Sequence, residues 1–205
     1  MRRTRLDPGD FLCDPIAQFS RWYREACSIH DKDPETPAAM ALATATKTGS
    51  VSVRYVLFKG IDNSGLVFYT DYTSPKGRDL NANPNAAVAF YWHELHRQVR
   101  ISGKVEKLSA MQSDAYFASR PRPSRIATAA YRQSRRIPLD TDLELTCATI
   151  ARSVRGKPIP RPPTWGGFRL VPHTIEFWQA GRFRVHDRFV YKKSGNKWKI
   201  NRLTP

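Results

Sequence analysis

The feature that most constrains the fold is a succession of short strand-like segments separated by tight turns. Five such segments precede the midpoint of the chain, at residues 40–46, 51–59, 66–70, 86–92 and 98–108. Lys47 to Ser50 and Asp62 to Gly65 have the composition of turns between neighbouring strands. Consecutive short strands joined by tight turns favour an antiparallel meander.

A second group of strands is expected in the C-terminal part. Its members are residues 167–170, 174–179, 188–193 and 198–203, and a Ser194 to Asn196 turn precedes the last of them. Residues 159–163 are rich in proline and are expected to be extended.

Helices are expected between and before these strands. Asp14-Pro15 has the pattern of an N-cap followed by proline at the first helical position, and predicts a helix that ends near His30. Capping-box spacing at Ser109 and at Thr141 predicts two more, the second ended by Gly156. Residues 74–83 and 124–130 are further candidates, and residues 31–37 are expected to form a loop. The pattern favours a mainly β (α+β) fold: a closed or half-closed antiparallel β-barrel with peripheral helices.

The length of 205 residues suits one domain, which would bury about 70% of its unfolded surface. We expect a single domain over residues 1–205, with residues 1–13 as a flexible N-terminal segment. No apolar run approaches the roughly 20 residues of a membrane helix, and no apolar signal core follows the basic start. The 3 cysteines are widely spaced and suit a reducing compartment, so a cytoplasmic location is expected.

The net charge of +16 calls for anionic partners. Nucleic acid, an anionic membrane and phosphorylated small molecules are the candidates. Residues 120–136 contain six arginines and no acid, and the planar fork of arginine matches phosphate oxygens well.

A basic stretch near the C-terminus is a candidate anion site. If residues 184–188 are extended, Arg184, His186 and Arg188 share one face, and Val185 and Asp187 share the other. Two permanent cations then flank a titratable imidazole. The competing interpretation is an exposed basic edge strand, where charge protects against aggregation.

The apolar strand at residues 54–59 carries a cation at each end, Arg54 and Lys59. This arrangement suits an amphiphilic anion with a flat ring, although two charges reaching out from a core strand would give the same pattern. No glycine-rich phosphate loop is present. His93 to His96 lacks the spacing of a zinc protease, so no metal is assigned. Neither a nucleophile beside a base nor a carboxylate pair is evident.

Nine sequence blocks occur in a characteristic order. They are RxVLxK (54–59), FYT (68–70), a turn containing Lys76, RQV (97–99), YFxSRPRxS (116–124), QS (133–134), WGGFR (165–169), IEFWQ (175–179) and RxHDR (184–188). Together they resemble the pyridoxine/pyridoxamine 5′-phosphate oxidase family. The resemblance covers the chain from about Asp14 to Pro205.

The resemblance implies a homodimer of split β-barrels with FMN in a cleft at the subunit interface. By position, the implied FMN-binding residues are Arg54, Lys59, Tyr69, Thr70, Lys76, Gln98, Gln133, Ser134, Trp178 and Arg188. The implied substrate-binding residues are Lys59, Tyr116, Arg120 and Ser124 at the phosphate, and Arg184 and His186 over the pyridine ring. The last two are also the implied catalytic residues. Pro75 stands where the family often has a second cation.

The implied reaction is oxidation of pyridoxamine or pyridoxine 5′-phosphate to pyridoxal 5′-phosphate, with dioxygen as acceptor and hydrogen peroxide as product. We expect Arg184 and His186 to orient the ring and stabilise charge rather than transfer protons. The alternatives are a flavin oxidase for another ring, such as a phenazine precursor, a flavin-binding or pyridoxal-phosphate-carrying protein without turnover, and a basic barrel that binds nucleic acid. The last is disfavoured because the aromatic residues fall at expected core positions.

Overall fold

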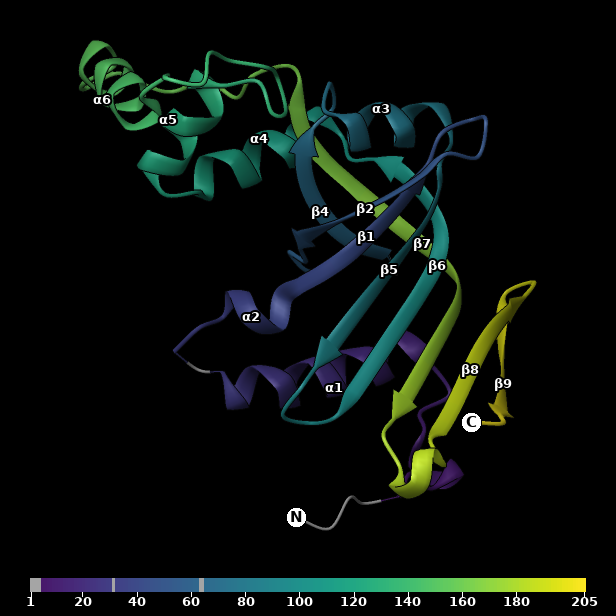
Figure 1. Cartoon of the computed structure of the whole chain (residues 1–205). Coiled ribbons are helices and arrows are strands. Elements are labelled where there is room, and N and C mark those ends of the chain that lie inside the picture. Colours follow the sequence, from purple (N-terminus) through teal and green to yellow (C-terminus); the bar gives the residue numbers. More distant parts are fainter. Residues whose placement is uncertain (1–4, 31, 63–64) are drawn as a thin grey trace.

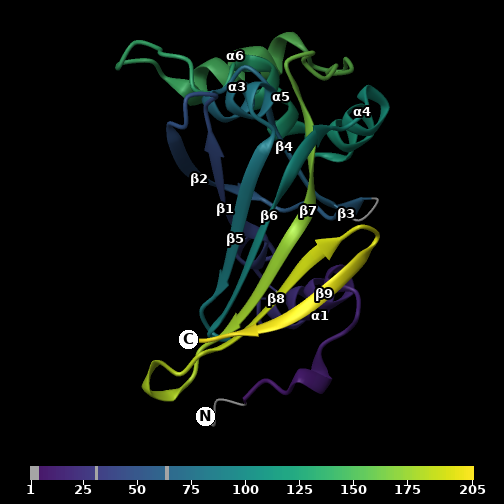
Figure 2. The ribbon, with the colours of Figure 1, turned by 90° about the vertical axis from the view of Figure 1, so that its right-hand side faces the viewer.

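The computed structural model describes residues 5–30, 32–62 and 65–205. In these residues, antiparallel strands form one curved sheet, a split barrel, with helices gathered at its two ends (Figure 1, Figure 2). The strand order is β2-β1-β5-β6-β7-β4-β3, and β8 pairs with both β7 and β9. The strands are β1 (Ala39–Ala45), β2 (Val51–Leu57), β3 (Ile61–Asp62), β4 (Gly65–Asp71), β5 (Asn85–Trp92), β6 (Arg97–Lys107), β7 (Trp165–Gln179), β8 (Asp187–Ser194) and β9 (Lys197–Leu203). The expected mainly β class with peripheral helices is confirmed.

The helices lie outside the barrel. They are α1 (Pro15–Ile29), α2 (Glu35–Ala38), α3 (Pro75–Ala82), α4 (Ala110–Ser119), α5 (Arg122–Ala130) and α6 (Leu143–Ser153), with short 3-10 turns η1 (Pro8–Asp10) and η2 (Arg182–Arg184). Helix α1 lies at the end where β5 turns into β6, whereas α4, α5 and α6 gather at the opposite end (Figure 1). No helix of the described residues has the length and apolar content that crossing a membrane requires.

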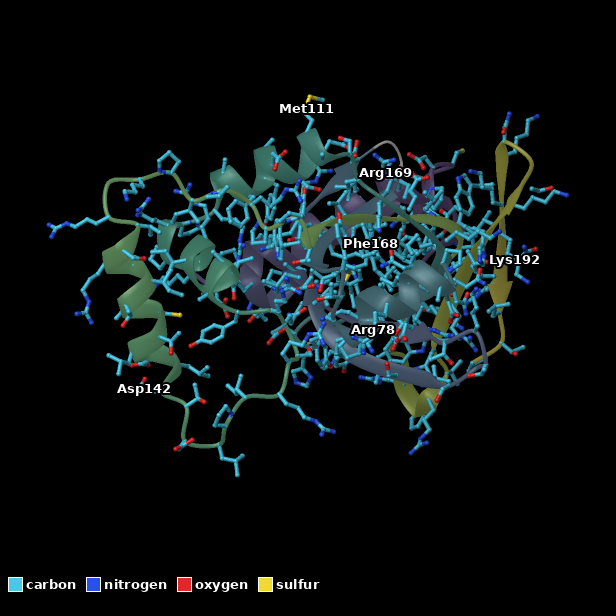
Figure 3. All side chains as sticks on the ribbon, turned by 90° about the horizontal axis from the view of Figure 1, so that it is seen from above. Arg78, Met111, Asp142, Phe168, Arg169 and Lys192 are labelled. Carbon is cyan, nitrogen blue, oxygen red and sulfur yellow. The ribbon has the colours of Figure 1, made fainter. Side chains whose placement is uncertain are left out.

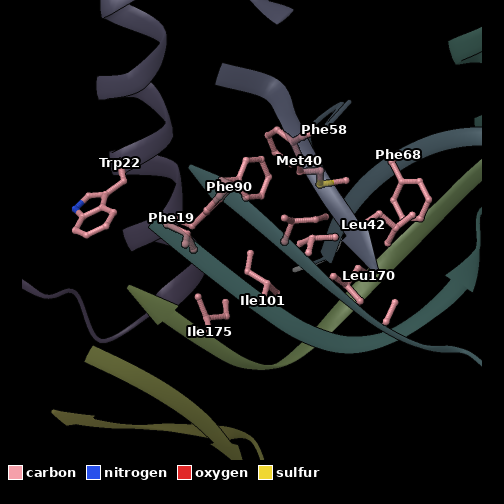
Figure 4. Close-up of a cluster of buried hydrophobic side chains, with 14 of the residues drawn as sticks. Phe19, Trp22, Met40, Leu42, Phe58, Phe68, Phe90, Ile101, Leu170 and Ile175 are labelled. Carbon is pink, nitrogen blue, oxygen red and sulfur yellow. The ribbon is translucent and has the colours of Figure 1, made fainter. Parts of the chain in front are cut away.

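The core fills the barrel between α1 and the sheet. Phe19 of α1 is fully buried, and its ring centroid lies 5.1 Å from that of Phe90 on β5. Ile101 of β6 and Ile175 of β7 continue the cluster below them (Figure 4). Burying each such side chain contributes about 1.5–3 kcal/mol, so α1 is held to the sheet mainly by apolar packing.

Most helix starts follow the sequence signals. The Asp14 carboxylate accepts from the backbone N–H groups of Ile16 and Ala17, and the Ser109 capping box is present. The second predicted capping box is wrong: Asp142, not Thr141, caps α6 by accepting from Leu145 N–H, because its carboxylate lies one position closer to the first turn. Helix α6 also ends at Ser153, before Gly156.

The prediction that residues 167–170 and 174–179 form two separate strands is wrong. Residues 167–170 and 174–179 belong to one strand, β7, which runs through Pro172. The register between β6 and β7 shifts at Ser102/Gly103, opposite Pro172, so that the missing N–H of proline falls at an irregularity in the ladder. A Cβ on Gly103 would lie 2.1 Å from the Val171 carbonyl oxygen, so the bulge depends on glycine at this position.

Two loops also differ from expectation. Residues 35–38 form the short helix α2, which begins inside the expected 31–37 loop and ends one residue beyond it, and Asp31 itself lies outside the described residues. Residues 184–188 are not extended throughout, because Phe183 and Arg184 have φ of 54° and 63° in η2, and β8 begins only at Asp187. Arg184 therefore does not share a strand face with Arg188. Residues 63–64 of the expected 62–65 turn lie outside the described residues.

The N-terminal segment expected to be flexible is described from Arg5 onward. Leu6 N–H donates to the Asp187 carboxylate at 3.1 Å, and Tyr191 O–H donates to the Leu12 carbonyl at 2.6 Å. The ring of Phe11 lies with its centroid 4.3 Å from that of Phe189. Residues 6–12 are thus packed against β8, next to the basic stretch.

Candidate functional site

A cleft of about 670 Å³ lies between β2, β4 and the helices α4 and α5. Its size is in the usual range for a small-molecule site. The expected site residues that line it are Arg54, Lys59, Tyr69, Thr70, Lys76, Tyr116, Arg120, Ser124, Gln133 and Ser134. These residues come from distant parts of the chain, and hydrogen bonds from Thr70 on β4 and Lys76 on α3 to Gln133 join them to the segment after α5.

Arg54 projects from β2 into this cleft. Its Nη1 donates to the Leu42 carbonyl at 3.2 Å and to Thr44 Oγ1 at 2.7 Å, and its Nη2 donates to Ser52. Thr44 in turn donates to the Asp79 carboxylate at 2.8 Å. Burial lowers the pKa of Arg54, and the Asp79 charge opposes that effect. The guanidinium is thus fixed in place by neutral acceptors.

Lys76, in the first turn of α3, is only 8% exposed. Its Nζ donates to Gln133 Oε1 at 2.7 Å, and that oxygen also accepts from Thr70 Oγ1 at 2.9 Å. Gln133 is itself held by a 3.3 Å bond from its backbone N–H to Asp71. The network joins β4, α3 and the segment after α5 at one point of the cleft.

The electrostatic state of Lys76 indicates an incomplete site. Burial lowers its pKa, the nearby Arg54 lowers it further, and Asp71 raises it. Among the described residues that line the cleft are four cations, Arg54, Lys59, Lys76 and Arg120, and a single acid, Glu35. A buried cation is costly without an anionic partner, so an anionic ligand would stabilise this arrangement.

Three parallel aromatic rings form one wall. The ring of Tyr69 stacks on Tyr116 with centroids 3.8 Å apart and on Trp165 at 5.4 Å. Burial raises the pKa of Tyr69 to about 12. The guanidinium of Arg120 lies 4.8 Å from the Trp165 centroid and donates to Thr128 Oγ1 at 2.8 Å. Burial also lowers the pKa of Arg120.

The remaining predicted residues lie at the other end of the sheet. They are Gln98, Trp178, Arg184, His186 and Arg188. Gln98 faces Trp178 in the β6–β7 register, and Trp178 faces Arg188 in the β7–β8 register. Arg188 Nε donates to Glu176 at 2.8 Å, and the His186 ring lies 4.6 Å from that of Trp178. Figure 1 places η2 at the opposite end of the barrel from α4 and α5.

Within one chain, therefore, the predicted residues form two separate sets. We call the cleft residues Arg54, Lys59, Tyr69, Thr70, Lys76, Tyr116, Arg120, Ser124, Gln133 and Ser134 the cleft set. We call Gln98, Trp178, Arg184, His186 and Arg188 the β8 set. Viewed along the barrel, α6 with Asp142 and β8 with Lys192 lie on opposite sides of the molecule (Figure 3).

Three residues of the cleft region were not predicted. Trp165 completes the aromatic stack, Thr128 holds Arg120, and Asp71 holds Gln133. The aromatic block at 165–169 was a signal for Trp165, whereas no local pattern marks Thr128. The described part of the chain contains no group of three or more metal-ligating side chains arranged to hold a metal ion.

The curved sheet and the cationic, aromatic-walled cleft define a split-barrel protein with a candidate anion-binding site. Comparison with known proteins gives the family. Residues 30–153 match the family model described as pyridoxamine 5′-phosphate oxidase, and residues 165–205 match the pyridoxine 5′-phosphate oxidase C-terminal dimerisation region. The chain belongs to the pyridoxamine 5′-phosphate oxidase family of FMN-dependent oxidoreductases.

Curated relatives and solved structures agree with this assignment. The chain is 49% identical over 206 residues to a pyridoxine/pyridoxamine 5′-phosphate oxidase of Burkholderia lata, covering 99% of this chain and 94% of the relative. It is 48% identical to that of Rubrobacter xylanophilus, over 94% of this chain and 87% of the relative. The crystal structure of PhzG from Burkholderia lata 383, in complex with tetrahydrophenazine-1-carboxylic acid, has a TM-score of 0.88 and 36% identity over 98% of both chains.

A more distant structure shows the same fold. An FMN-binding protein of Nostoc punctiforme, related to pyridoxamine 5′-phosphate oxidase, has a TM-score of 0.74 at 16% identity and covers 98% of this chain and 100% of its own. Family membership supports FMN as the cofactor, and the matched dimerisation region supports a homodimer.

Proposed function

We propose that the protein oxidises pyridoxamine 5′-phosphate and pyridoxine 5′-phosphate to pyridoxal 5′-phosphate, with dioxygen as the electron acceptor and hydrogen peroxide as the second product. The observation that carries this proposal is the excess of cations, with Lys76 buried among them, in a cleft that is also lined by stacked aromatic rings. Such a site suits ligands that combine a planar ring with a phosphate. The curated relatives at 48–49% identity have names that include this oxidase activity.

The donor set of the cleft fits the phosphate of FMN. A phosphate monoester carries about −1.5 to −2 charges at neutral pH, which matches two cations. Arg54 and Lys76 are close enough for the charge of Arg54 to lower the pKa of Lys76, and both are held by neutral oxygens. A dianion between them would relieve their mutual repulsion. The bound flavin supplies the two-electron chemistry that links the substrate to dioxygen.

A second phosphate, that of the substrate, would be bound by Lys59, Tyr116, Arg120 and Ser124. Arg120 offers a guanidinium that is already oriented by Thr128 and by the face of Trp165. A planar guanidinium can donate two parallel hydrogen bonds to phosphate oxygens. This contact would fix the position of the substrate ring relative to the flavin.

The β8 set would complete the site from the partner subunit. The η2 turn that contains Arg184 lies at the opposite end of the barrel from α4 and α5 (Figure 1), and neither Arg184 nor His186 lines the cleft of its own chain. We therefore propose that Gln98, Trp178, Arg184, His186 and Arg188 face the cleft of the partner in the homodimer. In this arrangement Arg184 and His186 would press the substrate ring against the flavin and stabilise charge.

A second candidate function is oxidation of a different ring. It is favoured by the high structural similarity to PhzG, whose crystal structure contains tetrahydrophenazine-1-carboxylic acid. A carboxylated ring without phosphate would not need the phosphate-binding group of Arg120, Tyr116 and Ser124. The presence of that group in this chain favours the phosphorylated substrates.

The test is the absorbance spectrum of the purified protein during anaerobic addition of pyridoxamine 5′-phosphate, with a reduced phenazine carboxylic acid tested in parallel. Bleaching of the flavin by the first compound, and recovery in air with formation of pyridoxal 5′-phosphate, is the expected result. Bleaching by the phenazine compound alone would instead establish the second function. A flavin that both compounds leave oxidised would contradict both functions and favour a carrier without turnover. A protein that takes up no FMN would reopen the nucleic-acid-binding alternative.

A further inference from the structure

The turn between β7 and β8 places a backbone donor against one ring nitrogen of His186. Gly181 N–H lies 3.2 Å from His186 Nδ1. A backbone N–H can only donate, so Nδ1 must present its lone pair to it. In a neutral imidazole, the proton then resides on Nε2.

The turn itself requires glycine at position 181. A Cβ there would lie 1.7 Å from the Val185 carbonyl oxygen, which is far inside contact distance. The chain closes on itself through Phe183 and Arg184, both at positive φ, and through a 2.9 Å bond from Val185 N–H to the Arg182 carbonyl. Positive φ is unfavourable for residues other than glycine, so this conformation must be held by its surroundings.

The imidazole is also held from the side. The Trp178 ring lies with its centroid 4.6 Å from that of His186, at an interplanar angle of 42°. Trp178 is fixed in β7 by its register with Gln98 and Arg188. The plane of the imidazole and the identity of its acceptor nitrogen are therefore set by two independent contacts.

We propose that Gly181 is a positioning residue that holds His186 as the neutral Nε2–H tautomer. The inference rests on the proposed function, in which His186 contacts the substrate ring. An imidazole with Nδ1 engaged by Gly181 presents only a donor at its free edge, because Nε2–H has no lone pair in the ring plane. His186 would thus donate a hydrogen bond to an acceptor on the substrate, such as a ring phenolate oxygen, and could not remove a proton from the substrate through Nε2.

The first test measures the tautomer directly. The holoenzyme is labelled with ¹⁵N-histidine, and the ring nitrogens of His186 are assigned by their loss in His186→Gln. We expect an unprotonated Nδ1 and a protonated Nε2 at neutral pH. In Gly181→Ala the displaced turn should break the bond to Nδ1, and the His186 signals should move toward a mixture of tautomers. Gly195→Ala is the control: its Cβ meets no atom within 4 Å, and its φ of 59° adds backbone strain in a different turn, so it tests for destabilisation that does not displace the Gly181 turn.

The second test compares two amides at position 186. Glutamine places an N–H donor near the position of Nε2, whereas asparagine places its amide near Nδ1. Loss of a hydrogen bond to a buried group costs roughly 10- to 100-fold, so His186→Asn should lose about that factor in kcat relative to His186→Gln. Flavin content and Tm should be equal in the two variants. Should Gly181→Ala fail to fold, the comparison of His186→Gln with His186→Asn still tests which ring nitrogen of His186 donates to the substrate.

Several results would overturn the inference: a proton on Nδ1 of the wild-type protein, unchanged His186 signals in a folded Gly181→Ala, or equal kcat losses for the two amides. These results can be separated from failure of the proposed function. The NMR spectrum needs no substrate, so absence of turnover with pyridoxamine 5′-phosphate would reject the function alone. A wrong tautomer in an enzyme that turns over normally would reject the inference alone.

Discussion

The Lys76 ammonium donates a 2.7 Å hydrogen bond to Oε1 of Gln133, a residue that follows α5 and is 57 positions further along the chain. The bond places a buried cation at the meeting point of β4, α3 and the α5 segment. The acceptor is a neutral amide oxygen, and the Asp71 charge, which raises the pKa of Lys76, offsets only part of the cost of burial. The cleft is therefore organised around a positive charge that a bound anion would neutralise.

Removing the positive charge of Lys76 should weaken FMN binding without lowering the stability of the apoprotein. In Lys76→Met, FMN should bind about 10- to 100-fold more weakly, because a charge-assisted hydrogen bond contributes about 1.5–3 kcal/mol. The Tm of the apoprotein should stay the same or rise, since the variant no longer buries an unpaired cation. Flavin fluorescence titration and thermal melts measure the two quantities. Lys47→Met, an exposed change in the β1–β2 turn, is the control. Unchanged FMN affinity in Lys76→Met would remove Lys76 from the proposed site.

The lowered pKa of Lys76 predicts a pH dependence of stability. The unfolded chain keeps this proton up to the ordinary value of 10.5, whereas the folded protein releases it at lower pH. The unfolded state thus holds more protons in this window, and the free energy of unfolding gains a positive slope with pH. Apoprotein stability should therefore rise relative to that of Lys76→Met as pH approaches 10.5 from below.

Urea denaturation of the apoproteins at several alkaline pH values measures this difference. Titration of the tyrosines affects both proteins and cancels in the comparison. The difference between wild type and Lys47→Met should stay flat over the same range. A flat difference between wild type and Lys76→Met would mean that burial does not penalise the Lys76 charge.

Arg120→Lys should weaken binding of the substrate phosphate. Lysine keeps the charge but lacks the planar fork and the stacking on Trp165, so KM for pyridoxamine 5′-phosphate should rise by roughly 10-fold with a smaller change in kcat. Steady-state kinetics measures both constants. Arg136→Lys, at an exposed position that does not line the cleft, should behave as wild type. If kcat instead falls by roughly 10-fold while KM stays unchanged, Arg120 acts in the chemical step.

A site built from two subunits should show complementation. Arg120→Ala in the cleft set and His186→Ala in the β8 set should each lower kcat/KM for pyridoxamine 5′-phosphate by roughly 10-fold or more as homodimers. Co-expressed with different affinity tags, they should form a heterodimer in which one cleft has all of its residues intact. Purified heterodimers should regain activity, measured as formation of pyridoxal 5′-phosphate. If each site is completed within its own chain, the heterodimer will stay inactive.

Packing of the N-terminal segment predicts a loss of stability in Phe11→Ala. The Phe11 ring lies 4.3 Å from Phe189 and 5.9 Å from Phe177, so its removal leaves a cavity against the sheet. We expect the free energy of unfolding to fall by about 2 kcal/mol, below the range for a fully buried phenylalanine. Urea denaturation measures this change. Leu12→Ala, at a side chain that is 41% exposed, should cost much less. Equal effects of the two changes would indicate that Phe11 is not anchored in solution.

Local interactions explain why much of the fold could be predicted from the sequence. The Asp14 and Ser109 caps, the strand periodicity and the β8–β9 turn each depend on residues within a few positions of one another. The family resemblance added the candidate residues, because ordered blocks such as RxVLxK and RxHDR carry information that periodicity does not. The cap of α6 was misplaced by one residue because Thr141 and Asp142 are both capable of capping.

Long-range contacts decided the rest. The continuity of β7 through Pro172 depends on a register shift in β6, which lies some 70 residues away. The conformation of Arg184 depends on the approach of Gly181 to Val185, not on the alternation of residues 184–188. The division of the site residues into a cleft set and a β8 set follows from the path of the strands along the barrel. The sequence alone determined which side chains are candidates for the chemistry, whereas the tertiary structure decided which of them meet in one chain, because sheet pairing joins segments that no local pattern relates.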